Sequence, residues 1–169
     1  MVKQYKVLVV GEGAVGKTSI ATRYTTGGFK ESHLMTVGAN FMLKNLEMES
    51  GDVVRLSIWD TAGQEKFRKV VETYYKGGKG VLLCFDITNR KSFEEIEYWR
   101  DTTKKNVPNA KFILVGNKSD LDDQRVVSTE EGETLAKEWG TSYFETSAKL
   151  NSGIDECFLK LTHLMLSGE

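Results

Sequence analysis

The sequence contains little cysteine and little proline. Its 169 residues include two cysteines, Cys84 and Cys157, which are too few for a disulfide framework. Neither has metal-ligand spacing to His33 or His163, so we predict two buried, reduced thiols. The single proline, Pro108, is expected in a loop, and no repeat or low-complexity stretch indicates a linker.

Long apolar runs and an excess of one charge are also missing. No segment approaches the length of a membrane-spanning helix, and no signal-peptide pattern opens the sequence. The 23 basic and 24 acidic residues give a formal net charge of −1, which does not support nucleic-acid binding or a charged membrane-binding surface. We expect a cytoplasmic, monomeric protein with one domain over residues 1–169, since this length can bury a full core.

Three short apolar runs predict buried strands. Residues 7–10, 81–85 and 112–115 are rich in β-branched or large apolar side chains, as in parallel strands covered on both faces. The runs are followed by longer stretches with helical periodicity. The C-terminal stretch has an apolar stripe formed by Ile154, Cys157, Phe158, Leu161 and Met165.

One region departs from this alternation of strand and helix. Residues 41–48 and 53–59 both have strand composition and are separated by a turn-forming cluster at residues 49–52. They predict a hairpin that adds one antiparallel edge to an otherwise parallel sheet. The expected fold is an α/β three-layer sandwich, with a mostly parallel sheet of about six strands.

Serine and acidic residues give signals for the starts of helices. Two pairs have capping-box spacing and a third is a weaker version: Ser92 with Glu95, Ser128 with Glu131, and Ser152 with Asp155. We expect a helix to begin at each of these serines.

Four of the expected strands run directly into glycine or polar residues. The residues in question are Gly11, Asp60, Asp86 and Asn117, the last preceded by Gly116. Ligands of open α/β sheets bind beyond the carboxyl ends of the strands. The chemistry is therefore expected at this one edge.

Residues 11–19, GEGAVGKTS, fit the phosphate-loop pattern G-x-x-x-x-G-K-[S/T] between an expected strand and an expected helix. Its glycines turn backbone N–H groups inward, and the helix directs its positive dipole end at the same phosphates. Lys17 brings a positive charge to the β- and γ-phosphates, and the Thr18 hydroxyl can ligate Mg²⁺. The loop predicts a nucleoside triphosphate with Mg²⁺, bound by Gly13, Ala14, Val15, Gly16, Lys17, Thr18 and Ser19.

An acidic residue at a second strand end completes the predicted magnesium site. Asp60 lies at the end of the strand at residues 53–59, and its carboxylate is a hard oxygen ligand of the kind Mg²⁺ prefers. The N–H of Gly63, three residues later, can bind a γ-phosphate.

Two polar stretches after later strands predict which base is bound. Asp120 can accept hydrogen bonds from the ring N–H and the exocyclic amine of guanine, a donor pair that adenine does not offer. Residues 147–149 can supply a backbone N–H to guanine O6, and Lys149 a side-chain stem over the ring. The predicted nucleotide is therefore a guanine nucleotide, and these stretches add Asn117, Lys118, Asp120, Ser147, Ala148 and Lys149 to the binding residues.

In this order and at these separations, the motifs are similar to those of the Ras-like small GTPases. The resemblance covers residues 4–166 and is carried by the phosphate loop, Thr36, WDTAGQE from Trp59, NKSD from Asn117 and SAK from Ser147. Within that superfamily, three segments resemble the Rab branch, namely residues 59–67, 74–80 and 85–89. The resemblance implies a small G domain of the P-loop NTPase type and a role in membrane trafficking.

Further residue roles are implied by the resemblance alone. Thr36 would ligate Mg²⁺ only while a γ-phosphate is bound, Phe29 would stack against the guanine, and Gln64 would orient the attacking water, acting in catalysis with Lys17. Gly13 would leave space beside the γ-phosphate for a partner's side chain. The aromatic positions that Rab proteins present to effectors are occupied by Phe41, Trp59 and Tyr74. Taken without the family, Phe29 and these three residues also fit ordinary hydrophobic packing.

The sequence departs from the Rab pattern in several places. Residues 37–41 read VGANF where most Rab proteins have IGVDF, and His33 stands where the family often has tyrosine. Residues 167–169, SGE, end the sequence without the cysteines that receive prenyl groups. Peripheral membrane attachment is therefore expected only through a tail absent from this sequence.

The predicted function is a GTP/GDP switch that hydrolyses GTP slowly with Mg²⁺. Since no arginine is obviously placed to act in cis, we expect a GTPase-activating protein, together with an exchange factor and effector proteins, as partners. A nucleotide-locked interaction module, a GTPase of the Ras or Rho branch and a metabolic P-loop kinase remain alternatives. A kinase would need an arginine-rich lid, and a Rho protein would carry an insertion between Val126 and Thr129, which this sequence does not have.

Overall fold

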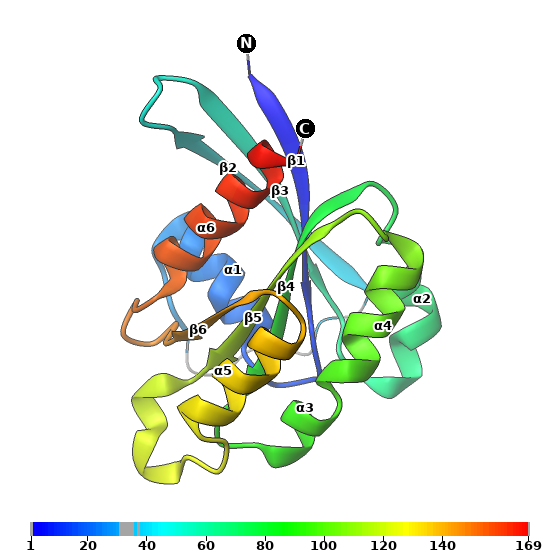
Figure 1. Cartoon of the computed structure of the whole chain (residues 1–169), viewed down its shortest axis with the longest axis vertical. Helices are drawn as coiled ribbons and strands as arrows, with labels where there is room; N and C mark the ends of the chain where they lie inside the picture. Colours follow the sequence, from blue (N-terminus) through cyan, green and yellow to red (C-terminus); the bar gives the residue numbers. More distant parts are fainter. Residues whose placement is uncertain (1, 31–35, 37, 169) are drawn as a thin grey trace.

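The described part of the chain forms one six-stranded sheet with helices on both faces (Figure 1). The computed structural model describes residues 2–30, 36 and 38–168. The strands are β1 (Lys3–Val10), β2 (Ala39–Glu47), β3 (Val53–Thr61), β4 (Gly78–Asp86), β5 (Lys111–Asn117) and β6 (Ser142–Thr146). The α-helices are α1 (Lys17–Thr26), α2 (Arg68–Glu72), α3 (Arg90–Glu94), α4 (Ile96–Asn106), α5 (Thr129–Glu138) and α6 (Ile154–Ser167). Two 3-10 helices are η1 (Glu65–Phe67) and η2 (Ser119–Gln124).

The strands lie in the order β2-β3-β1-β4-β5-β6. β2 pairs antiparallel with β3, and the other neighbouring pairs are all parallel. The predicted α/β class and the antiparallel edge hairpin are confirmed. Because the strand order reverses at β1, the segment that follows β1 lies at a topological switch point, where ligands of such sheets bind.

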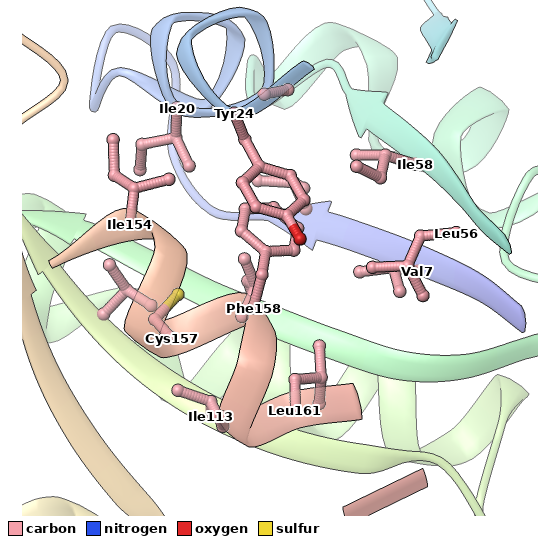
Figure 2. Packing of buried hydrophobic residues seen from close by; sticks show 14 of the residues in the cluster. Val7, Ile20, Tyr24, Leu56, Ile58, Ile113, Ile154, Cys157, Phe158 and Leu161 are labelled. Atoms are coloured by element: carbon pink, nitrogen blue, oxygen red, sulfur yellow. The ribbon is translucent and has the colours of Figure 1, made fainter. Parts of the chain in front are cut away.

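Helices cover both faces of the sheet and so explain the continuous apolar strands. On one face, α1 and α6 meet through Tyr24 and Phe158, whose rings are stacked with centroids 3.9 Å apart (Figure 2). The five residues of the predicted C-terminal stripe are all buried on this side. On the other face, α2, α4 and α5 contribute Val71, Trp99 and Ala136 to a second core. Strands between two apolar layers need apolar side chains in both directions.

The predicted helix starts are correct at one position of three. The Ser128 hydroxyl accepts a hydrogen bond from the N–H of the glutamate three residues later, whose carboxylate accepts one from Ser128 N–H, so α5 begins with the predicted capping box. The prediction at Ser92 is wrong because Asn89, three residues earlier, caps α3 and accepts from Ser92 N–H. The prediction at Ser152 is also wrong, since α6 begins after Gly153, which adopts a left-handed conformation with φ of 76°.

Two predictions made from scarce residues agree with the structure. Cys84 on β4 and Cys157 on α6 are both free thiols, buried in the core beneath α1 and α6. Pro108 lies in the turn between α4 and β5. Within the described ranges, none of the helices is both long enough and apolar enough to span a membrane.

Candidate nucleotide-binding site

A cleft of about 660 Å³ opens at the carboxyl ends of the central strands. Its volume lies within the usual range of small-molecule sites. The lining comes from the phosphate loop, α1, the segments before β2 and after β3, and the loops that follow β5 and β6. The lining residues are Gly13, Ala14, Gly16, Lys17, Thr18, Ser19, Phe29, Thr36, Thr61, Gly63, Gln64, Asn117, Lys118, Asp120, Leu121, Ala148 and Lys149.

Most of the predicted binding residues therefore line one cleft, and three of them are buried next to it. Val15, Asp60 and Ser147 are buried and do not line the cleft. Val15 belongs to the hydrophobic core, whereas Asp60 and Ser147 contact lining residues through their side chains. The cleft also includes Thr61 and Leu121, to which the sequence analysis assigned no role.

The phosphate loop ends in a helix start that suits an anion. Gly16 has a left-handed backbone with φ of 97°, and no side chain caps α1, in contrast to α5. Lys17 is buried, and its ammonium donates a hydrogen bond to the Glu12 carbonyl of the same loop. Burial lowers the pKa of Lys17, and the nearby Asp60 carboxylate opposes that shift. A buried ammonium gains from a further anionic partner, and phosphate supplies one.

The turn after β3 lies directly on the phosphate loop. A Cβ atom at Gly63 would lie 2.3 Å from the Glu12 carbonyl carbon and 2.5 Å from Gly13 N, so only glycine fits there. A Cβ atom at Gly13 would in turn lie 3.2 Å from Gln64 Cγ. Gln64, the predicted catalytic residue, is thus held beside the part of the loop where a γ-phosphate is expected.

Three oxygen-bearing side chains predicted to ligate a metal lie together. Thr18 Oγ1 donates to Asp60 Oδ2 at 2.6 Å, and Thr36 Oγ1 lies 3.0 Å from Thr18 Oγ1 and 3.5 Å from Asp60 Oδ2. Two hydroxyls and one carboxylate are hard oxygen donors, and they fit Mg²⁺. His33 and Val37, where the sequence departs from the Rab pattern, lie outside the described residues.

Two side chains of the NKSD stretch form hydrogen bonds with backbone carbonyls of the phosphate loop. Asn117 Nδ2 donates to the Val15 carbonyl at 3.0 Å, and Lys118 Nζ donates to the Ala14 carbonyl at 2.9 Å. Lys118 also forms an ion pair with Asp86 Oδ2 at 2.8 Å. Ala14 and Lys118 both have positive φ, at 62° and 66°, which is uncommon for residues other than glycine and typical of functional sites.

The two loops expected to recognise the base are joined to each other. Ser147 Oγ donates to Asp120 Oδ1 at 2.7 Å and accepts a hydrogen bond from Leu150 N–H at 3.0 Å. Thr146 Oγ1 donates to Asn117 Oδ1 at 2.9 Å. Asp120 and the residues after Ser147 are therefore fixed relative to each other on one side of the cleft.

Several charged residues around the cleft have structural roles that the sequence analysis did not predict. Arg23 on α1 donates to the carbonyls of the loop after β6. Glu12, inside the phosphate loop, pairs with Arg68 at the start of α2. Their partners are distant in sequence, so no local pattern could reveal them. Asp86 did carry a signal, because it ends a buried strand beside the predicted site, but it was assigned no role.

The predicted effector aromatics form a cluster of their own. The Phe41 and Trp59 ring centroids lie 5.4 Å apart, and those of Trp59 and Tyr74 lie 5.9 Å apart. Phe41 is 53 % exposed, so packing alone does not account for it. Lys6 Nζ lies 4.1 Å from the centre of the Trp59 ring. None of these side chains lines the cleft.

The fold and the cleft define a class, the α/β P-loop nucleotide-binding domains, and comparison with known proteins narrows it. The model of the Ras family matches residues 6–167. Rab-10 of Caenorhabditis elegans, a Ras-related protein, is 41 % identical over 164 residues, which cover 96 % of this chain and 81 % of the relative. The GTP-binding protein ypt2 of Schizosaccharomyces pombe is 41 % identical, over 92 % of this chain and 78 % of the relative.

A human relative agrees with these two. The Ras-related protein Rab-15 of Homo sapiens is 40 % identical over 171 residues, with 98 % of this chain and 80 % of the relative covered. The chain belongs to the Ras family of small GTPases and is most similar to its Rab branch. The predicted family is thereby confirmed.

Proposed function

We propose that this chain, as one G domain over residues 1–169, is a switch that cycles between GTP- and GDP-bound states. The observation that carries the proposal is the meeting of Thr36 with Thr18 and Asp60. Thr36 comes from the segment before β2, whereas the other two belong to α1 and β3. A segment joined to the site through one hydroxyl can be held while a γ-phosphate is present and released when it is lost.

Each part of the cleft has a proposed binding role. The phosphate loop and Lys17 would bind the β- and γ-phosphates, and Asp120 would bind the guanine edge. Thr18, Thr36 and Asp60 would hold Mg²⁺, which supplies positive charge to the phosphate oxygens when bound. Two observations support these assignments. Lys17 is buried, and the Thr18 hydroxyl contacts the Asp60 carboxylate, so charged and polar groups gather at one place in the site.

Hydrolysis would proceed at the γ-phosphate. Gln64 would orient a water molecule, whose oxygen forms a bond to the γ-phosphorus as the bond to the bridging oxygen breaks. GDP leaves with that oxygen, and the proton lost by the water passes to a phosphate oxygen. Lys17 would balance the negative charge that develops on the departing β-phosphate. Arg68 is engaged with Glu12 and Glu95, which supports slow turnover until an activating protein supplies an arginine.

The cluster of Phe41, Trp59 and Tyr74 would recognise effectors while the γ-phosphate orders the segments that carry Thr36 and Gly63. The exposure of Phe41, packed on the half-buried Trp59, supports that role, since an exposed apolar patch commonly marks a contact surface. The Rab-named relatives support action in membrane trafficking. An exchange factor and an activating protein would set the nucleotide state.

Two measurements test the proposal. The nucleotide that co-purifies with the protein is expected to be GDP or GTP, and single-turnover assays are expected to show slow cleavage of GTP. Gln64→Leu should slow cleavage strongly at unchanged nucleotide affinity, because it removes only the group that orients water. Gln4→Leu, an identical change at an exposed position on β1, is the matched control. Undetectable cleavage by wild type would favour a nucleotide-locked interaction module instead.

A further inference from the structure

Arg23, in the last turn of α1, binds three backbone carbonyls. Its Nε donates to the Ala148 oxygen at 2.7 Å and its Nη2 to the Lys149 oxygen at 2.9 Å. The remaining terminal nitrogen, Nη1, donates to the Gly27 oxygen at 2.8 Å, just beyond the end of α1. The two acceptors in the loop after β6 are consecutive, so one guanidinium fixes two successive peptide groups.

Most of the residues that Arg23 contacts line the cleft, and Gly27 is the exception. Ala148, Lys149 and Phe29 all line it, whereas Arg23 does not. The Arg23 guanidinium carbon also lies 5.7 Å from the centre of the Phe29 ring, within cation–π range. Arg23 therefore acts on the cleft only through other residues.

The loop after β6 is held from two directions. Ser147 at its start donates a hydrogen bond to Asp120 of the NKSD stretch. The carbonyls of the next two residues accept hydrogen bonds from Arg23 of α1. Arginine suits this task better than lysine, because its donors form a rigid planar fork, whereas an ammonium is a single compact centre.

Helix α1 thereby connects both ends of the cleft. Its first residue, Lys17, belongs to the phosphate loop, and Arg23 lies less than two turns further along the same rigid element. A ligand that spans the cleft meets phosphate contacts set by the start of α1 and base contacts set by its last turn.

We propose that Arg23 is a positioning residue for guanine recognition, which holds the loop after β6 so that a backbone N–H of residues 147–149 reaches O6 of the base. The inference rests on the proposed function, since it takes a guanine nucleotide as the ligand. It predicts that loss of Arg23 weakens one particular contact with the base. General loosening of the fold would instead weaken every contact alike.

The test compares three nucleotides in competition with fluorescently labelled GDP. In 6-thioguanosine diphosphate, sulfur replaces O6, and in inosine diphosphate the exocyclic amine bound by Asp120 is missing. Arg23→Gln is expected to reduce the preference for GDP over the 6-thio nucleotide by roughly threefold to tenfold. The preference for GDP over inosine diphosphate should change by less than about twofold. Arg23→Lys should give an intermediate loss.

Arg100→Gln is the matched control, because that arginine also lies on a helix and over an aromatic ring, 4.7 Å from the centre of Trp139. It should change neither preference. Arg23 variants with both preferences unchanged, or reduced by the same factor, would overturn the positioning role even if GDP bound more weakly. Wild-type protein that bound ADP as tightly as GDP would overturn the proposed function itself, and this inference with it.

Discussion

Glu12 Oε1 accepts a hydrogen bond from Arg68 Nη2 at 3.0 Å, which joins the phosphate loop to the first residue of α2. The same carboxylate oxygen accepts from Trp99 Nε1 at 2.9 Å, and Arg68 also pairs with Glu95 at 3.2 Å. The guanidinium carbon lies 4.0 Å from the centre of the Tyr98 ring. These contacts connect the turn that carries Gln64, the predicted catalytic residue, both to the phosphate loop and to α4.

The first prediction concerns this ion pair. Arg68→Ala should lower the free energy of unfolding by about 1–3 kcal/mol, because it leaves a mostly buried carboxylate without its charged partner. Urea unfolding in the same fixed excess of GDP measures this change, so that bound GDP adds to the free energy of unfolding of both proteins. Arg90→Ala, which breaks a more exposed pair with Glu131, should cost less than about 1 kcal/mol. Equal losses in the two variants would contradict the prediction.

The second prediction concerns metal dependence. Chelation of Mg²⁺ with EDTA should speed GDP release from wild type by roughly tenfold or more, because the phosphates lose a positively charged partner. Asp60→Asn should release GDP rapidly without EDTA and respond little to it, since an amide is a poorer ligand than a carboxylate. Stopped-flow measurement of labelled GDP release gives both rates. Asp101→Asn, at an exposed position on α4, is the control and should behave as wild type. A full EDTA response in Asp60→Asn would show that Asp60 does not ligate the metal.

The third prediction tests base recognition. Asp120→Asn should weaken GDP binding by about a hundredfold, as expected for the loss of two hydrogen bonds to a charged group. The variant should gain affinity for xanthosine diphosphate, because its amide can donate where the carboxylate accepted. Asp123→Asn, three residues along at an exposed position, is the control. Retention of guanine preference by Asp120→Asn would contradict the assigned contact.

A fourth prediction follows from a cluster behind the base-binding loops. Burial by itself would raise the pKa of Glu145, but hydrogen bonds from Arg125, Tyr143 and Thr129 outweigh it, and the pKa lies below its ordinary value. A lowered pKa in the folded state gives stability that is present above the unfolded value and is lost as the pH falls through the folded one.

Glu145→Gln is therefore expected to destabilise the protein by about 2 kcal/mol at neutral pH. The difference from wild type should begin to shrink below about pH 4.5, where the carboxylate of the unfolded chain becomes protonated, and should be lost as the pH falls through the lower pKa of the folded state. Unfolding curves recorded from pH 7 to pH 3.5 measure it. Glu138→Gln, at an exposed position on α5, should show no such pH-dependent difference, and a constant difference for Glu145→Gln would contradict the assigned cause.

The sequence predicts the fold and most of the cleft because their signals are local. Apolar runs, the turn at residues 49–52 and the phosphate loop each lie within a few residues, so their patterns can be recognised directly. Local signals fail where two residues compete for one role. Asn89 and Ser92 can each cap a helix, and only the register of α3 decides that Asn89 does so.

Contacts between distant segments could not be predicted from these patterns. Arg23 and the Ala148 carbonyl are 125 positions apart, and Arg68 and Glu12 are 56 apart. In the sequence, each of these charged residues resembles any other surface residue of a helix or loop. Their roles arise only after the sheet order has brought α1 against the loop after β6, and the turn after β3 against the phosphate loop.

The last prediction concerns the two thiols. Cys84 and Cys157 have no exposed surface, and burial raises the pKa of Cys84 to about 12 and that of Cys157 well above its ordinary value. Since the thiolate is the reactive form, neither should react with Ellman's reagent at pH 8 in the folded protein. Both should react in concentrated guanidinium chloride, which unfolds the chain.

The rate of thiol labelling also reports on ligand binding. Labelling through global unfolding should slow in proportion to added GDP, because GDP stabilises only the folded state. Ser167→Cys places a thiol at an exposed position near the end of α6, and it should react at once, at a rate independent of GDP. Fast, GDP-independent labelling of Cys84 would instead mean that β4 opens locally beside the phosphate loop. That result would contradict the packing of β4 between two apolar layers.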